Sequence, residues 1–554
     1  MQRSGRVFLL VAAGLFWLAG GACKCSEKEE KTKVAEPEGP QYESTVSKLP
    51  GVKQADVAAL IPQDSHLVVI SDDSARLLAW LEKREWFQEL KKTSFYDDLR
   101  YTGSWFRLST VKHRIESVSK VRVGDAGFSE MLRTPAGLAL RPKKQGKKQG
   151  TEVLLVKQID LQIQALDRLA EVFNQITPRE GMMKSRDLEG LKLRELTVDE
   201  QHKLYYLLFS NMLLVSNSED YLLQATELAR GQTSGSIADD SEIAALLLDG
   251  RDKYDLLVCL DPAGLRGKQQ TGMLEMVDRL MLRFKTGEPP RLEITGVLDK
   301  QKADKDLNVK FSGGKVVPLD TRMVLGLAQV DLKAAWKRMQ AKKPLPDKLK
   351  NSVTGKLLPA LGGEALVLLG GVDAGGKRPV PQAALLVKVD KQKVPGAVEA
   401  TGNLFAFLFG EEAKKRVLRQ MSNHEIWMLP GDEAFTPGFS VVGDWLVLCT
   451  SEKMLRKIVA TSVGHEPAIG DQPGFKDKVL GGRPYFFMTY LDCGLLFEDL
   501  KTYFRSVTKL GDRFDQATVE ETVTPLLDAL KKTGKFGGTV NQRGAGINGS
   551  VVSL

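Results

Sequence analysis

The sequence predicts an α+β protein that consists of two tandem, homologous units. Two observations carry this prediction: blocks of sequence recur in the same order along the chain, and within each set strand-like and helix-like runs alternate and end in a hairpin. A chain of 554 residues is also too long for one compact core. We therefore expect units at residues 51–313 and 314–554, each a largely antiparallel, curved sheet with helices packed on one face.

Each expected unit opens with a Pro-Asp turn, an apolar strand and an amphipathic helix. The first copy of this block starts at Leu60 and the second at Val316. The residues that correspond are Pro62 and Pro318, Asp64 and Asp320, and Trp80 and Trp336. Pro and Asp favour turns, so the turn is expected at the same place in both copies.

The second block predicts two strands followed by a helix. It lies near Leu132 in the first copy and near Leu357 in the second. The helix of the first copy is predicted from apolar residues spaced by three and four, namely Leu161, Ile163, Leu166, Leu169 and Phe173.

A third block, a strand followed by a helix, starts at Phe209 in the first copy and at Phe439 in the second. In the first copy, Ser216 or Asn217, followed by Glu219, is expected to cap the N-terminus of the helix.

The closing blocks are an apolar strand that runs into an aspartate, and then a hairpin. The aspartates are Asp261 and Asp492, and the hairpins span residues 291–312 and 535–554. These strand runs are mostly four to eight residues long and are bounded by Gly, Pro and Asp, which is typical of strands.

With these blocks the chain resembles a bacterial family of unknown function found in exported proteins and lipoproteins, whose members open on a Leu-Pro-Ala-Asp-Thr-like strand. The segments that carry the resemblance are 61–64, 213–219 and 260–261 in the first copy, and 317–320 and 446–452 in the second. Gln63 and Leu319 stand where the family usually has Ala. The family has no established chemistry, so the resemblance implies no catalytic residue.

The N-terminus resembles a bacterial lipoprotein signal over its first two dozen residues. Arg3 and Arg6 form a basic start, and an uncharged apolar stretch and small residues lead to Cys23. We expect a signal peptide at residues 1–22 and acyl chains on Cys23, which would anchor the protein to a membrane. A flexible, charged tether is expected at residues 23–50.

Two other interpretations of this N-terminus stay open. One is an uncleaved membrane helix, although the uncharged stretch is shorter than the ~20 residues that a span needs. The other is ordinary secretion with cleavage after Ala22. By the resemblance to lipoproteins, Lys24 rather than Asp after the cysteine implies the outer membrane, with the body facing the periplasm or the surface.

Composition excludes few functions. A hydrophobic content of 42% is that of a globular protein. The net charge is +9, and the densest group of basic residues, in an expected hairpin loop, is Lys143, Lys144, Lys147 and Lys148. Nucleic acid is not expected as a partner of an exported chain. The remaining cysteines, Cys259, Cys449 and Cys493, lie in or beside apolar runs and predict buried free thiols, with a single Cys449–Cys493 bridge as the alternative.

No arrangement of residues predicts catalysis, a metal site or a cofactor. A glycine-rich stretch from Gly371 to Lys377 resembles a phosphate-binding loop, but Arg378 replaces the Ser or Thr, and a hairpin turn is the favoured interpretation. Asp261 and Asp492 end apolar strands and are interpreted as turn-forming residues bonded to their own backbone.

An aromatic cluster is the one candidate for a ligand site. Its proposed members are Trp80, Trp86, Tyr101, Trp105 and Phe106. These side chains would line an apolar groove, and core packing is the alternative interpretation.

Together, these features predict a non-enzymatic lipoprotein of the cell envelope that acts as a binding or scaffolding module. Its expected partners are the membrane, through the N-terminal lipid, and an envelope protein, lipid or glycan. A periplasmic carrier of an apolar ligand or lipid is the first alternative, and a hydrolase is the second.

Overall fold

The computed structural model shows two compact units. The residues that it describes are 56–96, 134–143, 150–158, 183–188, 190–197, 203–209, 211–240, 254–261, 277–298, 308–328, 332–342, 344–374, 379–409, 417–429, 435–480, 484–509, 515–543 and 546–554. The first unit comprises Met1–Glu82, Leu99–Leu274 and Asp278–Thr286, and the second comprises Lys83–Asp98, Glu275–Val277 and Gly287–Leu554. The predicted signal peptide, the predicted tether and the predicted helix at 161–173 lie outside the described residues.

The first unit is an antiparallel sheet with helices, as the α+β prediction requires. Its strands, in the order in which they pair, are β9 (Val277–Lys285), β8 (Leu256–Leu260), β1 (Leu67–Ser71), β2 (Ala136–Pro142), β3 (Thr151–Gln158), β7 (Met212–Ser216), β6 (Lys203–Phe209), β5 (Leu191–Thr197) and β4 (Met183–Leu188). Its described helices are α2 (Ser74–Glu82) and α8 (Glu219–Ala229), with the short turns η2 (Ala58–Leu60) and η3 (Ile237–Asp239).

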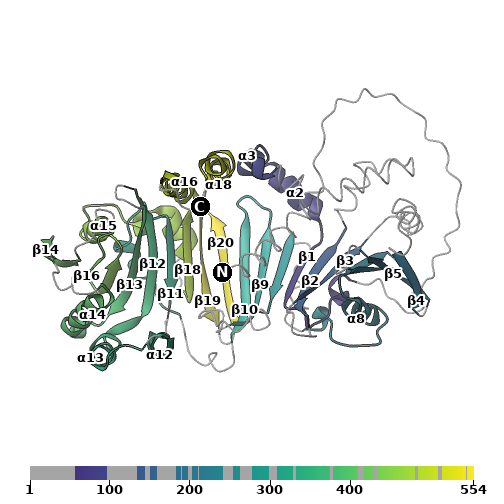
Figure 1. The fold of residues 1–554 in the computed structure, drawn as a ribbon, viewed down its shortest axis with the longest axis horizontal. Helices are drawn as coiled ribbons and strands as arrows, with labels where there is room; N and C mark the ends of the chain where they lie inside the picture. Colours follow the sequence, from purple (N-terminus) through teal and green to yellow (C-terminus); the bar gives the residue numbers. More distant parts are fainter. Residues whose placement is uncertain are drawn as a thin grey trace. The chain divides into compact units, whose positions relative to one another are not determined.

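The second unit has a larger antiparallel sheet, whose strands β13, β12, β11, β18, β19 and β20 lie side by side in Figure 1. The full order is β10 (Arg291–Leu298), β20 (Gly546–Ser553), β19 (Lys535–Arg543), β18 (Phe487–Asp492), β11 (Met323–Leu327), β12 (Leu361–Asp373), β13 (Val380–Val389), β17 (Trp445–Cys449), β16 (Gly438–Val442), β15 (His424–Met428) and β14 (Val417–Met421).

The second unit contains one helix from the N-terminal part of the chain, α3 (Glu85–Leu90), and further helices from residues 332–531. The further helices are α12 (Leu332–Lys342), α13 (Asp347–Ser352), α14 (Val394–Phe409), α15 (Glu452–Ser462), α16 (Cys493–Lys509), α17 (Gln516–Thr518) and α18 (Thr524–Lys531). The short 3-10 helices are η5 (Gly313–Lys315), η7 (Lys391–Lys393) and η9 (Ile469–Asp471). The π-helical segments are η6 (Val353–Leu357), η10 (Phe475–Leu480) and η11 (Val519–Val523).

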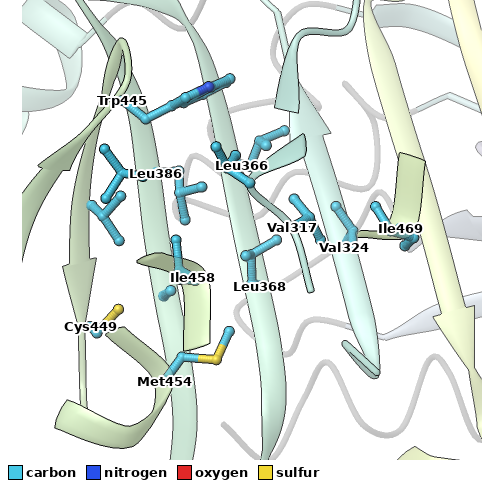
Figure 2. Packing of buried hydrophobic residues seen from close by; sticks show 14 of the residues in the cluster. Val317, Val324, Leu366, Leu368, Leu386, Trp445, Cys449, Met454, Ile458 and Ile469 are labelled. Atoms are coloured by element: carbon cyan, nitrogen blue, oxygen red, sulfur yellow. The ribbon is translucent and has the colours of Figure 1, made fainter. Parts of the chain in front are cut away.

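Helices cover both faces of the sheet of the second unit, so the expectation of helices on one face was wrong. On β17, Trp445, Val447 and Cys449 point to a core that includes residues of α15 (Figure 2). Leu446, between them, points to the opposite face and packs with residues of α13 and α14. The physical reason is visible in the strand itself, since an apolar run without polar alternation requires burial on both sides.

The chain order and the compact units do not coincide. In the sequence, helix α3 lies between α2 and β2, which both belong to the first unit. In the structure it packs against α18 of the second unit (Figure 1), and Lys532 Nζ lies 2.7 Å from Glu85 Oε1. Strand β10 also precedes residue 314, and it pairs with β20 from Arg291 opposite Val552 onward. The predicted boundary between residues 313 and 314 therefore stays a prediction about the repeated sequence.

The predicted Pro-Asp turn of the first unit is part of a buried ionic network. Arg141 on β2 donates to Glu152 on β3 at 2.7 Å and to Asp64 of the turn at 3.0 Å. Its guanidinium carbon lies 4.0 Å from the ring centroid of Tyr221 on α8, and Ser65 shares a 2.6 Å hydrogen bond with the Tyr221 hydroxyl. The turn, two strands and the helix are thus joined through one cation.

In the second unit the corresponding aspartate is compensated from a different element. Asp320 pairs with Lys457 on α15, and Arg322 Nη1 lies 3.5 Å from the Asp320 carboxylate. Arg322 also donates to Asp499 on α16 at 2.5 Å. In both units, then, the aspartate of the opening turn is held by a cation that lies elsewhere in the fold.

Ser218, rather than Ser216 or Asn217, caps α8. The Ser218 hydroxyl accepts from the Tyr221 amide, whereas the Ser216 hydroxyl donates to the Val153 carbonyl at 2.7 Å. The expected cap was therefore one or two residues too early, because β7 extends to Ser216. In the second unit, Ser451 caps α15 in the same manner by accepting from the Met454 amide.

We predict that Arg141→Ala lowers the free energy of unfolding of the first unit by about 3–5 kcal/mol, because it leaves the buried Glu152 carboxylate without its cation. Urea unfolding followed by far-UV circular dichroism measures this change. Lys203→Ala, which removes an exposed pair with Glu195 in the same unit, is the control and should leave the unfolding midpoint unchanged. Wild-type stability of the Arg141 variant would show that the network adds no net stability.

Candidate binding surface

The aromatic residues predicted to line a groove are only partly within the described residues. Trp80 lies on α2, and its ring packs edge-on against Phe284 with centroids 5.3 Å apart, inside the first unit. Trp86 lies on α3 in the second unit and packs edge-on against Phe87 at 5.7 Å. Both tryptophan side chains are half-buried.

The other members of that cluster, Tyr101, Trp105 and Phe106, lie outside the described residues, as does Cys23. Because Trp80 and Trp86 belong to different units, the geometry of each unit assigns them no common site. The groove therefore stays a prediction.

A different apolar surface runs across one face of the sheet of the second unit. Residues directly opposite each other in antiparallel pairs point to the same face. The register places one such row, named here the apolar row, on seven neighbouring strands: Leu418, Trp427, Phe439, Leu448, Leu385, Val367 and Leu325. At a strand spacing of ~4.8 Å, the row is about 29 Å long.

The apolar row is unevenly covered. Phe439 is buried beneath α14, but Leu385, in the middle of β13, is 37% exposed and Leu418 is also exposed. Leu448, Val367 and Leu325 are half-buried. A large apolar side chain that is exposed at the centre of a sheet leaves apolar area in contact with solvent, which a ligand or partner can cover.

Aromatic rings connect this row to the surface. Trp427 stacks on Phe439 with centroids 6.2 Å apart and planes at 13°, and Phe439 contacts Phe405 of α14 at 5.2 Å. Phe405 then contacts Phe409 at 5.6 Å, and Phe409 contacts Phe435 at 6.2 Å. The series runs from the buried Phe439 and Phe405 to Phe409 and Phe435, which are exposed.

The C-terminal end of α14 is the most exposed apolar part of this surface. Phe407 is 41%, Leu408 58% and Phe409 40% exposed. We call these three residues, together with Phe435, the aromatic tip. The tip was not predicted from the sequence, although one signal was present: after Glu399 the helix carries no charged residue and ends in the apolar run from Leu404 to Phe409.

The strand-end aspartates have separate partners. The Asp492 carboxylate accepts from the Leu495 amide in the first turn of α16 at 3.0 Å. It thus bonds to nearby backbone as predicted, but at the start of a helix instead of in a turn, and Lys535 Nζ lies 3.0 Å from it. Asp261 instead lies 2.8 Å from Nδ1 of His66. A His-carboxylate pair can orient an imidazole, but a reaction also needs a group for it to act on.

The structure confirms two predictions about local features, the hairpin at the glycine-rich stretch and the buried thiols. The glycine-rich stretch starts inside β12, where Gly371 lies opposite Gln382, and β12 and β13 pair antiparallel up to Asp373 opposite Val380, which confirms the predicted hairpin. Cys259, Cys449 and Cys493 are free and buried, which confirms the buried thiols over the Cys449–Cys493 bridge.

The described part of the chain contains neither a metal-binding cluster nor a membrane-spanning helix. No group of three or more His, Cys, Asp or Glu side chains in it is placed to hold a metal ion. None of its helices has both the length and the apolar character that are needed to cross a membrane.

Comparisons with known proteins identify no family. No family model matches the chain. No curated protein matches it either. Among solved structures, the chain is similar to one described as crystal form I of TP0453, with 8% sequence identity and a TM-score of 0.18, over 74% of this chain and 98% of that chain. A similarity of this size supports no conclusion about fold or function.

We predict that the three buried thiols resist alkylation in the native state. Burial raises the pKa of Cys259 to about 12 and also raises the pKa of Cys449 and Cys493. A higher pKa means less thiolate at a given pH, and the thiolate is the nucleophile. At about pH 8, mass spectrometry of single peptides should show alkylation by iodoacetamide at Cys25, in the predicted tether, and at the buried thiols only after unfolding in urea. Rapid native alkylation of Cys449 would contradict this.

Proposed function

We propose that this chain is a non-enzymatic lipoprotein of a bacterial cell envelope whose body binds an apolar partner. The observation that supports a binding role best is the aromatic tip, where three consecutive large apolar side chains of α14 are exposed to solvent. The lipid anchor rests on the signal-like N-terminus that ends at Cys23. The body would face the periplasm or the cell surface from the outer membrane.

We further propose that the body arose by tandem duplication. β1 pairs with β2 and β8, and β11 pairs with β12 and β18 in the corresponding way. Isolated bridges repeat as well, since Pro62 pairs with Ser236 and Pro318 with Ala468. This agreement of strand order and turn contacts supports a common origin more strongly than the sequence blocks do alone.

Side-chain contacts follow the same repeat. Arg186 of β4 pairs with Glu219 in the first turn of α8, and Arg419 of β14 pairs with Glu452 in the first turn of α15. Both pairs span 33 residues of sequence. A contact of this kind need not be kept for stability, because exposed ion pairs contribute little, and its repetition therefore favours descent from one ancestral unit.

The anchor is tested by cell fractionation. We predict that Cys23→Ser moves the protein from the membrane to the soluble fraction, because the residue that would carry the acyl chains is lost. Cys25→Ser is the matched control and should stay with the membrane, since Lys24 makes Cys25 a poor acceptor.

Either of two results would contradict the anchor. Continued membrane fractionation of Cys23→Ser would favour an uncleaved N-terminal helix. A wild-type chain that is soluble from the start, with its N-terminus at Cys23 and no added mass, would favour ordinary secretion.

The apolar row supports a second candidate, a carrier of an apolar ligand. A carrier would retain lipid when it is purified without detergent, and native mass spectrometry would show the added mass. Leu385→Asp places a charge in the middle of the row and should abolish that mass, whereas Val463→Asp, at an exposed position beyond α15, should not. A wild-type mass without ligand argues against the carrier.

A further inference from the structure

Helix α14 packs on the core through one face, and its C-terminal part carries no charge. Ala397, Ala400, Thr401 and Phe405 are buried, and their spacing of three and four forms the stripe that faces the core. The last charged residue of the helix is Glu399, whose carboxylate binds Lys356 Nζ at 2.6 Å. The ten residues after Glu399 carry no charge.

At the end of α14, exposure is not limited to one face. Phe407, Leu408 and Phe409 are consecutive, and successive residues of a helix are rotated by about 100°, so these three side chains cover roughly 200° of its circumference. A protein groove takes up a single stripe of a helix, at positions i, i+3 and i+4. An apolar surface that extends around the helix end instead matches a medium that surrounds it.

Neighbouring rings hold this end in place. Phe409 packs between Phe405 and Phe435, and Phe405 packs on the buried Phe439. A continuous series of ring contacts therefore connects the exposed apolar residues to the core of the second unit. These contacts fix the position of the helix end relative to the unit.

We infer that the aromatic tip inserts into the surface of a lipid bilayer. This inference rests on the proposed envelope location: a tether of about 30 residues reaches about 30 Å if it is flexible, so the body would stay close to the membrane at a high effective concentration. The exposed end of α14, from Phe407 to Phe409, rises only about 3 Å along the helix axis. The tip would therefore enter the surface of one leaflet and would not span the ~30 Å core. Insertion at this depth agrees with the lack of a membrane-spanning helix in the described ranges.

The test uses the Cys23→Ser chain, which has no acyl group, with vesicles of phosphatidylethanolamine and phosphatidylglycerol. We expect the chain to float with the vesicles, and Phe407→Ser/Leu408→Ser to lower its partition coefficient about tenfold or more, because apolar area is lost from the insert. Val463→Ser/Leu495→Ser removes two exposed apolar side chains elsewhere in the second unit and should leave the partition coefficient unchanged.

A second measurement keeps the inference testable if the double variant misfolds. Phe407→Trp places a reporter at the tip, and its fluorescence should shift to the blue and be quenched by lipids brominated on the acyl chain. Absence of quenching, absence of vesicle binding, or equal losses in the tip pair and the control pair would each overturn the inference. The inference would also be overturned if a crosslinker at position 408 captured a protein in cells and the Phe407→Trp chain showed no quenching with vesicles.

The two claims fail separately. The vesicle assay contains no acyl anchor, so insertion of the tip can be observed even if Cys23 is not lipidated. Conversely, release of Cys23→Ser from membranes would support the anchor even if the tip does not insert.

Discussion

The register of the central strands is the constraint on which the rest of each unit depends. β1 and β11 are paired along both edges, and every further strand is added in antiparallel register from them. Because side chains alternate between faces, a slip of one residue in β11 would exchange Val324, in the core, with Leu325, on the apolar row. The core, the apolar row and the position of α14 above Phe439 all follow from this register.

Charge compensation at the opening turn shows how the two units solve one problem with different residues. In the first unit, Leu140 of β2 lies opposite Leu67 of β1. In the second unit, Leu369 of β12 lies opposite Met323 of β11, so that Leu369 corresponds to Leu140. The next residue is Arg141 in the first unit but a glycine in the second. Glycine offers no cation, and the aspartate of the second turn is compensated from α15 instead. The aspartate is thus constant, while the source of the positive charge is exchangeable.

The aromatic tip and the apolar row show why burial matters more than composition for a binding surface. α14 has the same apolar character along its last two turns, yet Phe405 is buried and Phe407 is exposed. The difference lies in the elements around them, because β16 brings Phe439 against one side of the helix and no described element covers the other. Exposed apolar residues on a rigid scaffold lose little conformational freedom on binding.

Local sequence was sufficient for the opening turns, the alternation of strands and helices and the buried thiols, because these depend on neighbours a few residues away. It also indicated the repeated blocks, whose strand order the pairing follows. Local sequence did not reveal that α3 and β10 pack in the second unit, that helices cover both faces of its sheet, or that Phe407 and Leu408 stand in solvent. Each of these depends on contacts between segments far apart in the chain, and burial is decided only when those segments meet.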